Sequence, residues 1–166
     1  MIGGQPAPAI KPDPAIKPDP AIKIARDLCI VFEGMYLKPY LCPARVPTIG
    51  VGSTFYENGI RVTLADPPIT RERAMQLLDH ELKACLPRVL RLCPQLRLWG
   101  DNATGAILDF AFNCGTGALQ NSTLRKRINA DDAEGAKKEL MKWVRGGGRV
   151  LPGLVRRRAA EVALLP

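Results

Sequence analysis

Three prolines spaced four residues apart, Pro39, Pro43 and Pro47, constrain the fold of this chain more than any other feature of its sequence. Proline removes a backbone donor and clashes with the preceding helical turn, so we expect no helix in the segment 36–62. The same segment holds the alternating run TIGVGST and an Asn58-Gly59 pair, which is a strong signal for a hairpin turn. The sequence therefore predicts two or three short antiparallel strands here.

Helical periodicity flanks this segment on both sides. The run from Ile24 to Phe32 has apolar residues at helical spacing and predicts one amphipathic helix that leads into Glu33. After the strands we expect a long helix with Thr70 as its N-cap, and Pro87 should kink or end it. Further helices are predicted in segments 101–117, 121–129 and 131–144 and, after a glycine loop, towards residue 164.

A proline-rich repeat precedes the predicted folded part. PAIKPD at residues 8–13 recurs at 14–19, and PAIK follows at 20–23. Proline at every third or fourth position blocks helix and sheet pairing alike, which predicts an extended, semi-rigid arm over residues 1–21. Such an arm can be a tether, a wall-contacting element or a passive linker. In a chain that is 46% hydrophobic, residues 22–166 are long enough to bury one core and are expected to form an α+β domain.

The charge balance limits the classes of partner. A net charge of +8 favours anionic partners such as nucleic acid, a membrane surface or cell-wall polymers. No nucleic-acid motif and no interleaving of aromatic with basic residues appears, so we expect no nucleic-acid partner. No Cys and His spacing fits a zinc site, and we expect neither metal nor cofactor. No apolar run approaches the roughly 18 residues of a membrane span, and no signal peptide is visible.

Glu33 is the first candidate for chemistry. Its neighbours in IVFEGMYL are apolar, which should leave an ionised carboxylate poorly solvated. An acid that keeps its proton near neutral pH can serve as a general acid. Cys42 and Thr48 follow it with the spacing Glu-x8-Cys-x5-Thr.

This spacing resembles the catalytic segment of phage-type lysozymes of glycoside hydrolase family 24. In that family the pattern is Glu, eight residues, Asp or sometimes Cys, five residues and Thr, and the Thr opens a TIGxG run; EGMYLKPYLCPARVPTIGVG fits it. Two more segments, AILDFAFNCGTGALQNSTLRKRIN and KWVRGGGRVLPGLVRRRAAE, resemble the family's central and closing motifs. Together the three cover nearly everything from about residue 24 to 164. The resemblance implies a lysozyme-like fold, with a small β-hairpin lobe, a mainly helical lobe and a cleft between them.

The resemblance also implies a function. It is that of an endolysin which hydrolyses the β-1,4 bond between N-acetylmuramic acid and N-acetylglucosamine in peptidoglycan and needs no cofactor. Glu33 would protonate the glycosidic oxygen, while Thr48 and Cys42 would hold and activate a water on the other side of the sugar ring, as in inverting enzymes. The substrate-binding residues implied by the same motifs are Gly50, Gly52, Ser53 and Asn113, although Asn113 could equally brace its helix end. A monomer would be made in the host cytoplasm and act in the periplasm, with its basic surface available for anionic wall or outer-membrane contacts.

Two departures from the family pattern leave other functions open. Cys42 stands where many relatives have Asp, and Ser53 where His is frequent. A thiol is mostly neutral near pH 7; desolvation beside a carboxylate would raise the pKa of Cys42, whereas a nearby cation such as Arg45 would lower it. A lytic transglycosylase needs one acid and no water-activating carboxylate, so it is the first alternative. A wall-binding lysozyme homologue with weak or no activity is the second.

Cysteines and arginines outside the catalytic spacing have structural interpretations. An odd total of five cysteines leaves at least one thiol free in a single chain. The pairings that spacing suggests are Cys85 with Cys93, and Cys29 with Cys42. Alternatively, Cys29 is a small core residue packed under its helix. Arg157 and Arg158 are expected to brace the fold through contacts to carbonyls and acids.

Overall fold

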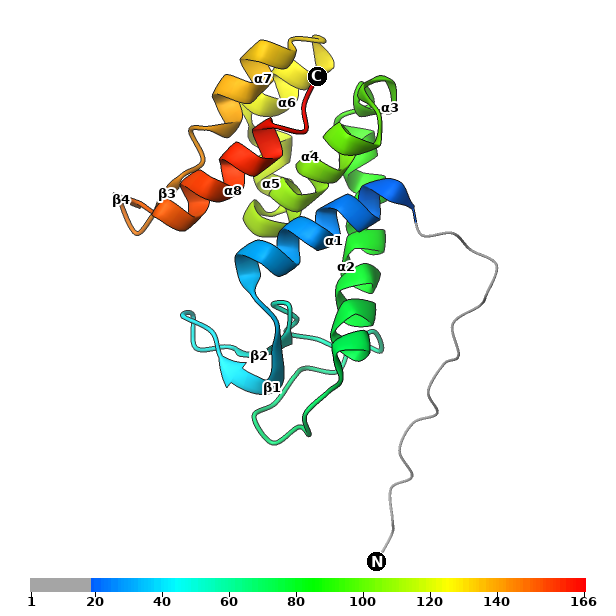
Figure 1. Cartoon of the computed structure of the whole chain (residues 1–166), viewed down its shortest axis with the longest axis vertical. Helices are drawn as coiled ribbons and strands as arrows, with labels where there is room; N and C mark the ends of the chain where they lie inside the picture. The colour runs from blue at the N-terminus through cyan, green and yellow to red at the C-terminus, as the bar shows by residue number, and fades with distance from the viewer. Residues whose placement is uncertain (1–18) are drawn as a thin grey trace, which may run out of the picture.

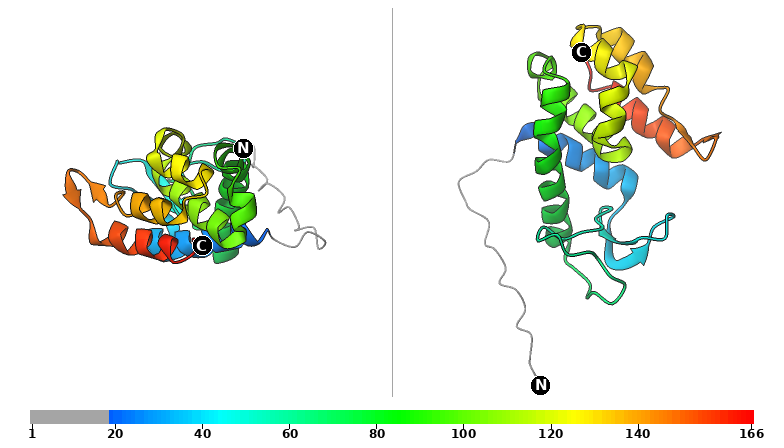
Figure 2. Two further views of the ribbon diagram at one scale, coloured as in Figure 1. Left: turned by 90° about the horizontal axis from the view of Figure 1, so that it is seen from above. Right: turned by 180° about the vertical axis from the view of Figure 1, so that it is seen from behind.

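Two lobes joined by one long helix make up residues 19–166, the part of the chain that the computed structural model describes (Figure 1). The small lobe holds a hairpin of β1 (Tyr36–Leu41) and β2 (Pro47–Gly50), and the larger lobe is helical. Helix α2 (Arg71–Leu92) runs from one lobe to the other, as the view from behind also shows (Figure 2). The predicted α+β class, a small hairpin lobe beside a mainly helical one, is confirmed.

Helix α1 (Pro20–Glu33) begins inside the segment predicted to be an extended arm. Pro20 lies in the first helical turn, where a missing N–H costs no helical hydrogen bond. The side chain of Asp19 caps the helix by accepting the N–H of Ala21 at 2.9 Å. The third PAIK copy is therefore helical, and the helix begins before residue 22, the predicted domain boundary. Residues 1–18 of the predicted arm lie outside the described residues.

The hairpin of the small lobe follows directly from the end of α1. Gly34 has a φ of 78°, a conformation that glycine adopts readily, and it ends the helix just before β1. Strands β1 and β2 pair antiparallel, with Tyr40 opposite Thr48. An isolated bridge from Phe55 to Arg61 spans the predicted Asn-Gly turn. The short antiparallel strands predicted from the proline and glycine pattern are therefore present.

Helix α2 starts where the sequence predicted but continues past Pro87. The Thr70 side chain accepts the Arg73 N–H at 3.1 Å and caps the helix. Pro87 cannot donate to the carbonyl of Lys83 one turn earlier, yet both residues are exposed, so water can satisfy that carbonyl. The helix runs on to Leu92. The sequence predicted that Pro87 would either kink or end the helix, and the helix does not end there.

Helix α4 (Asp101–Cys114) is the centre of the helical lobe. Every residue from Ala103 to Ala111 is buried. Helix α1 packs along it so closely that a Cβ on Gly105 would lie 2.6 Å from Cγ2 of Ile24. The other elements of this lobe are α3 (Leu96–Trp99), α5 (Thr116–Asn121), α6 (Thr123–Asn129), α7 (Ala133–Leu140), β3 (Arg145–Gly146), β4 (Arg149–Val150) and α8 (Pro152–Val162). Of these, the short helices α3 and α5 and the β3–β4 hairpin were not predicted.

None of the helices in residues 19–166 combines the length and the apolar character that crossing a bilayer requires. The long helix α2 is amphipathic instead, because its buried residues Leu78, Leu82 and Leu86 recur every four positions.

Candidate active site

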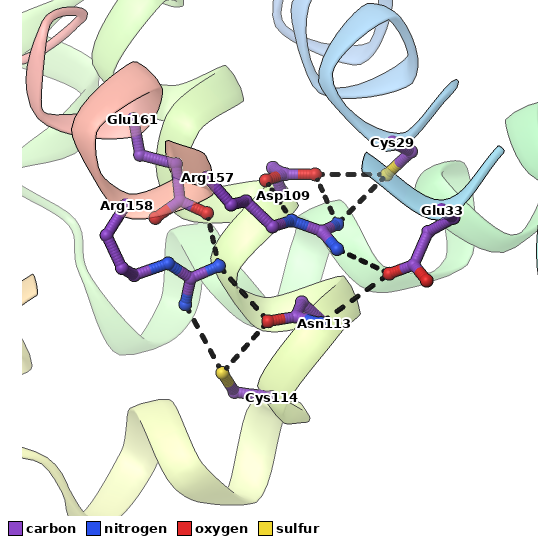
Figure 3. Close-up of polar contacts among 8 residues, drawn as sticks. All are labelled: Cys29, Glu33, Asp109, Asn113, Cys114, Arg157, Arg158 and Glu161. Carbon is purple, nitrogen blue, oxygen red and sulfur yellow. Dashed lines mark hydrogen bonds and ion pairs between the residues drawn. The ribbon is translucent and has the colours of Figure 1, made fainter. Parts of the chain in front are cut away.

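Glu33 is the last residue of α1, at the junction between the two lobes. Its side chain is 31% exposed, so it is accessible to a ligand. The Oε1 atom forms an ion pair with Nη1 of Arg157 and lies 3.5 Å from Nδ2 of Asn113 (Figure 3). The flanking sequence predicted apolar surroundings for this carboxylate, but its contacts are with polar side chains. The apolar flanks run along the chain, whereas the side chain points towards polar groups on α4 and α8.

Asp109, on α4, is the functional candidate that sequence reasoning missed. It is fully buried and holds the guanidinium of Arg157 by two hydrogen bonds, Nε to Oδ2 at 2.9 Å and Nη2 to Oδ1 at 2.7 Å. The thiol of Cys29 donates to the same Oδ1 at 3.1 Å. The available signal was a single acid within the apolar run AILDFAF, because a charged group in a buried helix needs a partner.

Arg158 forms a second buried cluster next to the first. Its Nη2 donates to Oε1 of Glu161 at 2.6 Å and to Oδ1 of Asn113 at 3.1 Å. Its guanidinium also lies 5.0 Å from the ring centroid of Phe110. Asn113 therefore contacts Arg158 through its oxygen and Glu33 through its nitrogen, which links the two clusters (Figure 3). Both arginines contact acids, as the sequence predicted.

Cys42 lies in the tight turn between β1 and β2. The Arg45 N–H donates to the Cys42 carbonyl at 2.7 Å, and the Cys42 N–H donates to the Val46 carbonyl at 3.1 Å. The turn brings backbone amides close to the sulfur, and the amide hydrogen bond from Val46 is the main cause that lowers the pKa of the Cys42 thiol. The Arg45 side chain, the cation expected to do this, is not among the causes.

Thr48 lies opposite the end of β1 and is only 2% exposed. Its hydroxyl donates to the Val46 carbonyl at 2.9 Å, and its side chain also helps to lower the pKa of Cys42. Across the strand pair, burial raises the pKa of Tyr40, and the charges of Tyr36, Cys42 and Glu33 raise it further. The phenol of Tyr40 therefore lies within the electrostatic reach of both Glu33 and the Cys42 thiol.

The residues predicted to bind substrate differ in exposure. Gly52 is exposed, with a φ of 91° and open space where a side chain would stand. Gly50 is buried, and a Cβ on it would lie 3.5 Å from the Cα of Ala74 on α2. Ser53 is also buried, and its hydroxyl has no partner among the described residues. Gly50 and Ser53 therefore pack the small lobe here, and their contact with substrate stays a prediction.

Two cavities occur elsewhere in residues 19–166. One of about 220 Å³ lies beside the start of α1 and is lined by residues such as Leu86 and Leu90. The other, of about 380 Å³, lies between the small lobe and α2 and is lined by residues such as Phe55 and Glu81. Neither is lined by Glu33, so the predicted cleft over this residue stays a prediction.

The sequence suggested two disulfide pairings, but all five cysteines are free thiols. Cys29 is a buried residue of α1 whose thiol contacts Asp109. It is therefore the core residue of the alternative interpretation and is not paired with Cys42. The suggested pair of Cys85 with Cys93 is not formed either. Within residues 19–166, no three His, Cys, Asp or Glu side chains gather in a way that could hold a metal ion.

Comparisons with known proteins agree with one another. The family model described as phage lysozyme matches residues 31–161. An endolysin of Acyrthosiphon pisum secondary endosymbiont phage 1 is 38% identical over 137 residues, which cover 80% of this chain and 88% of the relative. A SAR-endolysin of Escherichia phage Mu is 32% identical over 147 residues, covering 86% of this chain and 78% of the relative. The solved structure of an endolysin from Escherichia coli O157:H7 phage FAHEc1 matches with a TM-score of 0.76 and 28% identity, over 86% of this chain and 90% of that one.

Proposed function

Because the chain belongs to the phage lysozyme family, it is a peptidoglycan-degrading glycoside hydrolase of the endolysin type, and we propose that Glu33 is its general acid. The observation that supports this role is that both polar contacts of the carboxyl group reach Oε1, from Arg157 and from Asn113. The other oxygen, on a side chain that is 31% exposed, remains to carry a proton to the glycosidic oxygen. A positioned general acid typically contributes about 10²–10⁴-fold to the rate.

Cys42 and Thr48 supply the other half of the proposed mechanism. Amide hydrogen bonds lower the pKa of Cys42, so the thiolate can accept a proton from a water molecule that the pair positions. Attack of this water on the face of the sugar opposite Glu33 inverts the anomeric centre, for which the two groups should stand roughly 6.5–9.5 Å apart in the complex. The scissile bond is the β-1,4 linkage after N-acetylmuramic acid.

The remaining assignments describe how the substrate is bound. A glycan strand would lie between the lobes, over the junction of α1 and β1, with the exposed backbone at Gly52 on one side and Asn113 on the other. Gly50 and Ser53 would contribute by holding β2 against α2. The enzyme would act as a monomer in the host periplasm, without nucleic acid, and the exposed Arg149 and Arg156 could meet anionic groups of the wall or outer membrane.

Digestion of purified peptidoglycan, followed by mass spectrometry of the soluble products, tests this function. A muramidase leaves reducing N-acetylmuramic ends and, in H₂¹⁸O, incorporates one heavy oxygen for each bond that it cleaves. A transglycosylase would leave 1,6-anhydro ends without heavy oxygen. Binding to sacculi without soluble products would support the non-catalytic homologue.

The same digestion with a Glu33→Gln variant links the activity to the proposed acid. A folded variant that still releases reducing ends at the wild-type rate would remove Glu33 from the mechanism. On a soluble oligosaccharide, NMR of the first product anomer distinguishes inversion, which gives the α-anomer, from retention.

A further inference from the structure

Asp109 cannot touch a substrate, because it has no exposed surface and lies under α1 and α8. Its two carboxylate oxygens are taken by Nε and Nη2 of Arg157. Such a paired contact fixes the plane of a guanidinium as well as its position. The remaining terminal nitrogen, Nη1, is then directed at Oε1 of Glu33 (Figure 3).

The contact between Arg157 and Glu33 creates a problem for the proposed reaction. A general acid must hold its proton until the glycosidic bond breaks, whereas a neighbouring cation stabilises the ionised carboxylate. Asp109 offsets that effect, because its negative charge lies against the same guanidinium. A pair that is close to neutral favours the ionised form of Glu33 much less than a bare cation would.

The other ionisable groups around Glu33 do not offset the arginine. They are Cys29 on α1, Tyr40 on β1, Cys42 after β1, and Arg158 and Glu161 on α8. Cys42 is not among the hydrogen-bond partners of the Arg157 guanidinium. Burial raises the pKa of Cys29 and of Tyr40, which keeps both neutral near pH 7. Burial likewise raises the pKa of Glu161 to about 10. Asp109 is therefore the anion that compensates Arg157.

We propose that Asp109 is a positioning residue for the general acid: it holds Arg157 so that a single N–H reaches Glu33, and its negative charge offsets the charge of that guanidinium beside the acid. This inference rests on the proposed role of Glu33. It adds a residue outside the Glu33, Cys42 and Thr48 spacing, and it assigns to the buried ion pair an effect on protonation as well as on stability.

Titration of the Glu33 carboxyl carbon by ¹³C NMR, in protein labelled with ¹³C-glutamate, tests the proposal without relying on activity. The Glu33 signal is the one that disappears in Glu33→Gln. In Asp109→Asn the midpoint should fall by about one pH unit or more, because Glu33 loses a negative neighbour and keeps the cation. An Asp109→Asn protein that is folded and titrates like the wild type would overturn the proposal.

Arg157→Lys gives a second variant with the opposite expectation. A lysine keeps the charge that buried Asp109 needs, but its ammonium cannot reproduce the fork that serves both carboxylates. Glu33 then loses its cation, and its midpoint should rise. An unchanged midpoint in Arg157→Lys would count against the proposal even where Asp109→Asn does not fold.

Asp79→Asn is the matched control. Asp79 also pairs with an arginine of another helix, Arg26 at 2.9 Å, and it belongs to neither cluster around Glu33. It should leave both the Glu33 midpoint and the activity unchanged. A shift in this variant equal to that in Asp109→Asn would show a general loss of packing and overturn the specific role.

Activity measurements separate this inference from the proposed function. If Glu33→Gln digests peptidoglycan at the wild-type rate, Glu33 is not the acid, and the role of Asp109 in catalysis falls with it. If Glu33→Gln is inactive while Asp109→Asn retains both the wild-type midpoint and the wild-type rate, only the inference about Asp109 fails. The expected result is an inactive Glu33→Gln and an Asp109→Asn whose activity is lost at a lower pH than in the wild type, by the same shift as the NMR midpoint.

Discussion

Arg158 donates a hydrogen bond to Glu161 across one turn of α8, with Nη2 and Oε1 2.6 Å apart and neither side chain exposed. The second oxygen of Glu161 has no hydrogen-bond partner among residues 19–166. An ionised carboxylate with a buried, unpaired oxygen is unfavourable, and burial raises the pKa of Glu161 to about 10. A protonated Glu161 still accepts from Arg158 through Oε1, so the contact is compatible with the neutral form.

Glu161→Gln should therefore change how stability depends on pH. In the unfolded chain this carboxyl group has a pKa of about 4.3, so between that value and the folded-state pKa the folded protein holds a proton that the unfolded chain has released. The free energy of unfolding of the wild type should consequently decrease as pH rises through this window. Glutamine does not titrate and removes this decrease, so the variant should be more stable than the wild type at alkaline pH. Urea denaturation at several pH values measures both.

Glu134→Gln is the control for that prediction. Glu134 also pairs with a basic residue three positions away, Lys137, but its side chain is 75% exposed. Its lowered pKa affects the pH dependence of stability only in the acid range, so between about pH 5 and the folded-state pKa of Glu161 the variant should show the same slope as the wild type. An unchanged slope in Glu161→Gln would mean that Glu161 is ionised when folded.

The close approach of α1 and α4 depends on Gly105. A Cβ there would lie 2.6 Å from the Ile24 side chain and 2.9 Å from the Ala21 carbonyl oxygen, which is backbone and cannot rotate away. Gly105→Ala should therefore destabilise the protein by about 1–3 kcal/mol, as overpacking of a core typically does. Gly117→Ala on α5, where a Cβ would meet nothing within 4 Å, should be neutral or slightly stabilising. Thermal unfolding of the two variants would contradict this if their midpoints moved equally.

Glu33→Gln should abolish lysis of cell walls while leaving the fold intact. Glutamine keeps the shape of the side chain and an oxygen that can accept from Arg157, but it has no proton to donate to the glycosidic oxygen. The rate should fall by about 10²–10⁴-fold, which is the usual contribution of a general acid. Turbidity loss of purified sacculi gives the rate, and circular dichroism gives the fold. Asp27→Asn, at an exposed position of the same helix, should remain fully active.

Cys42 should be replaceable by aspartate but not by alanine. Aspartate offers a carboxylate in the turn whose amides already lower the pKa of the thiol, so Cys42→Asp should match or exceed wild-type activity. Alanine has no group to accept a proton from water, and Cys42→Ala should be slower. Equal rates for Cys42→Ala and the wild type would exclude the thiol from the reaction and favour the transglycosylase alternative, which the anhydro ends of the products would reveal.

Local patterns in the sequence predicted the framework of the fold. The prolines at Pro39, Pro43 and Pro47 excluded helix from the small lobe, and the Thr70 cap marked the start of the long helix. Pro20 misled in the opposite direction, because a proline that would break a helix in its interior can occupy the first turn of one once Asp19 caps it. Proline alone does not specify which of the two occurs.

The contacts around Glu33 could not be read in the same way. Glu33 and Arg157 are far apart in the sequence and meet only through the packing of α1 against α8. A spacing of residues identified Glu33, Cys42 and Thr48 as candidates, but spacing carries no information about long-range partners. The buried Asp109 showed itself only as an acid out of place in an apolar run, and its partner depended on the tertiary structure.

Alkylation should select Cys42 from the five thiols. Backbone amides lower its pKa and its side chain is partly exposed, whereas burial raises the pKa of Cys29, Cys85, Cys93 and Cys114. Because the thiolate is the nucleophile, iodoacetamide should label Cys42 first, and the labelling rate should level off at a lower pH than for a free thiol of pKa about 8.5. Peptide mapping by mass spectrometry at increasing times gives the order, and activity should be lost in step with labelling of Cys42. Cys42→Asp should keep its activity under the same treatment; if it is inactivated as fast as the wild type, or if Cys114 reacts first, another thiol controls the enzyme.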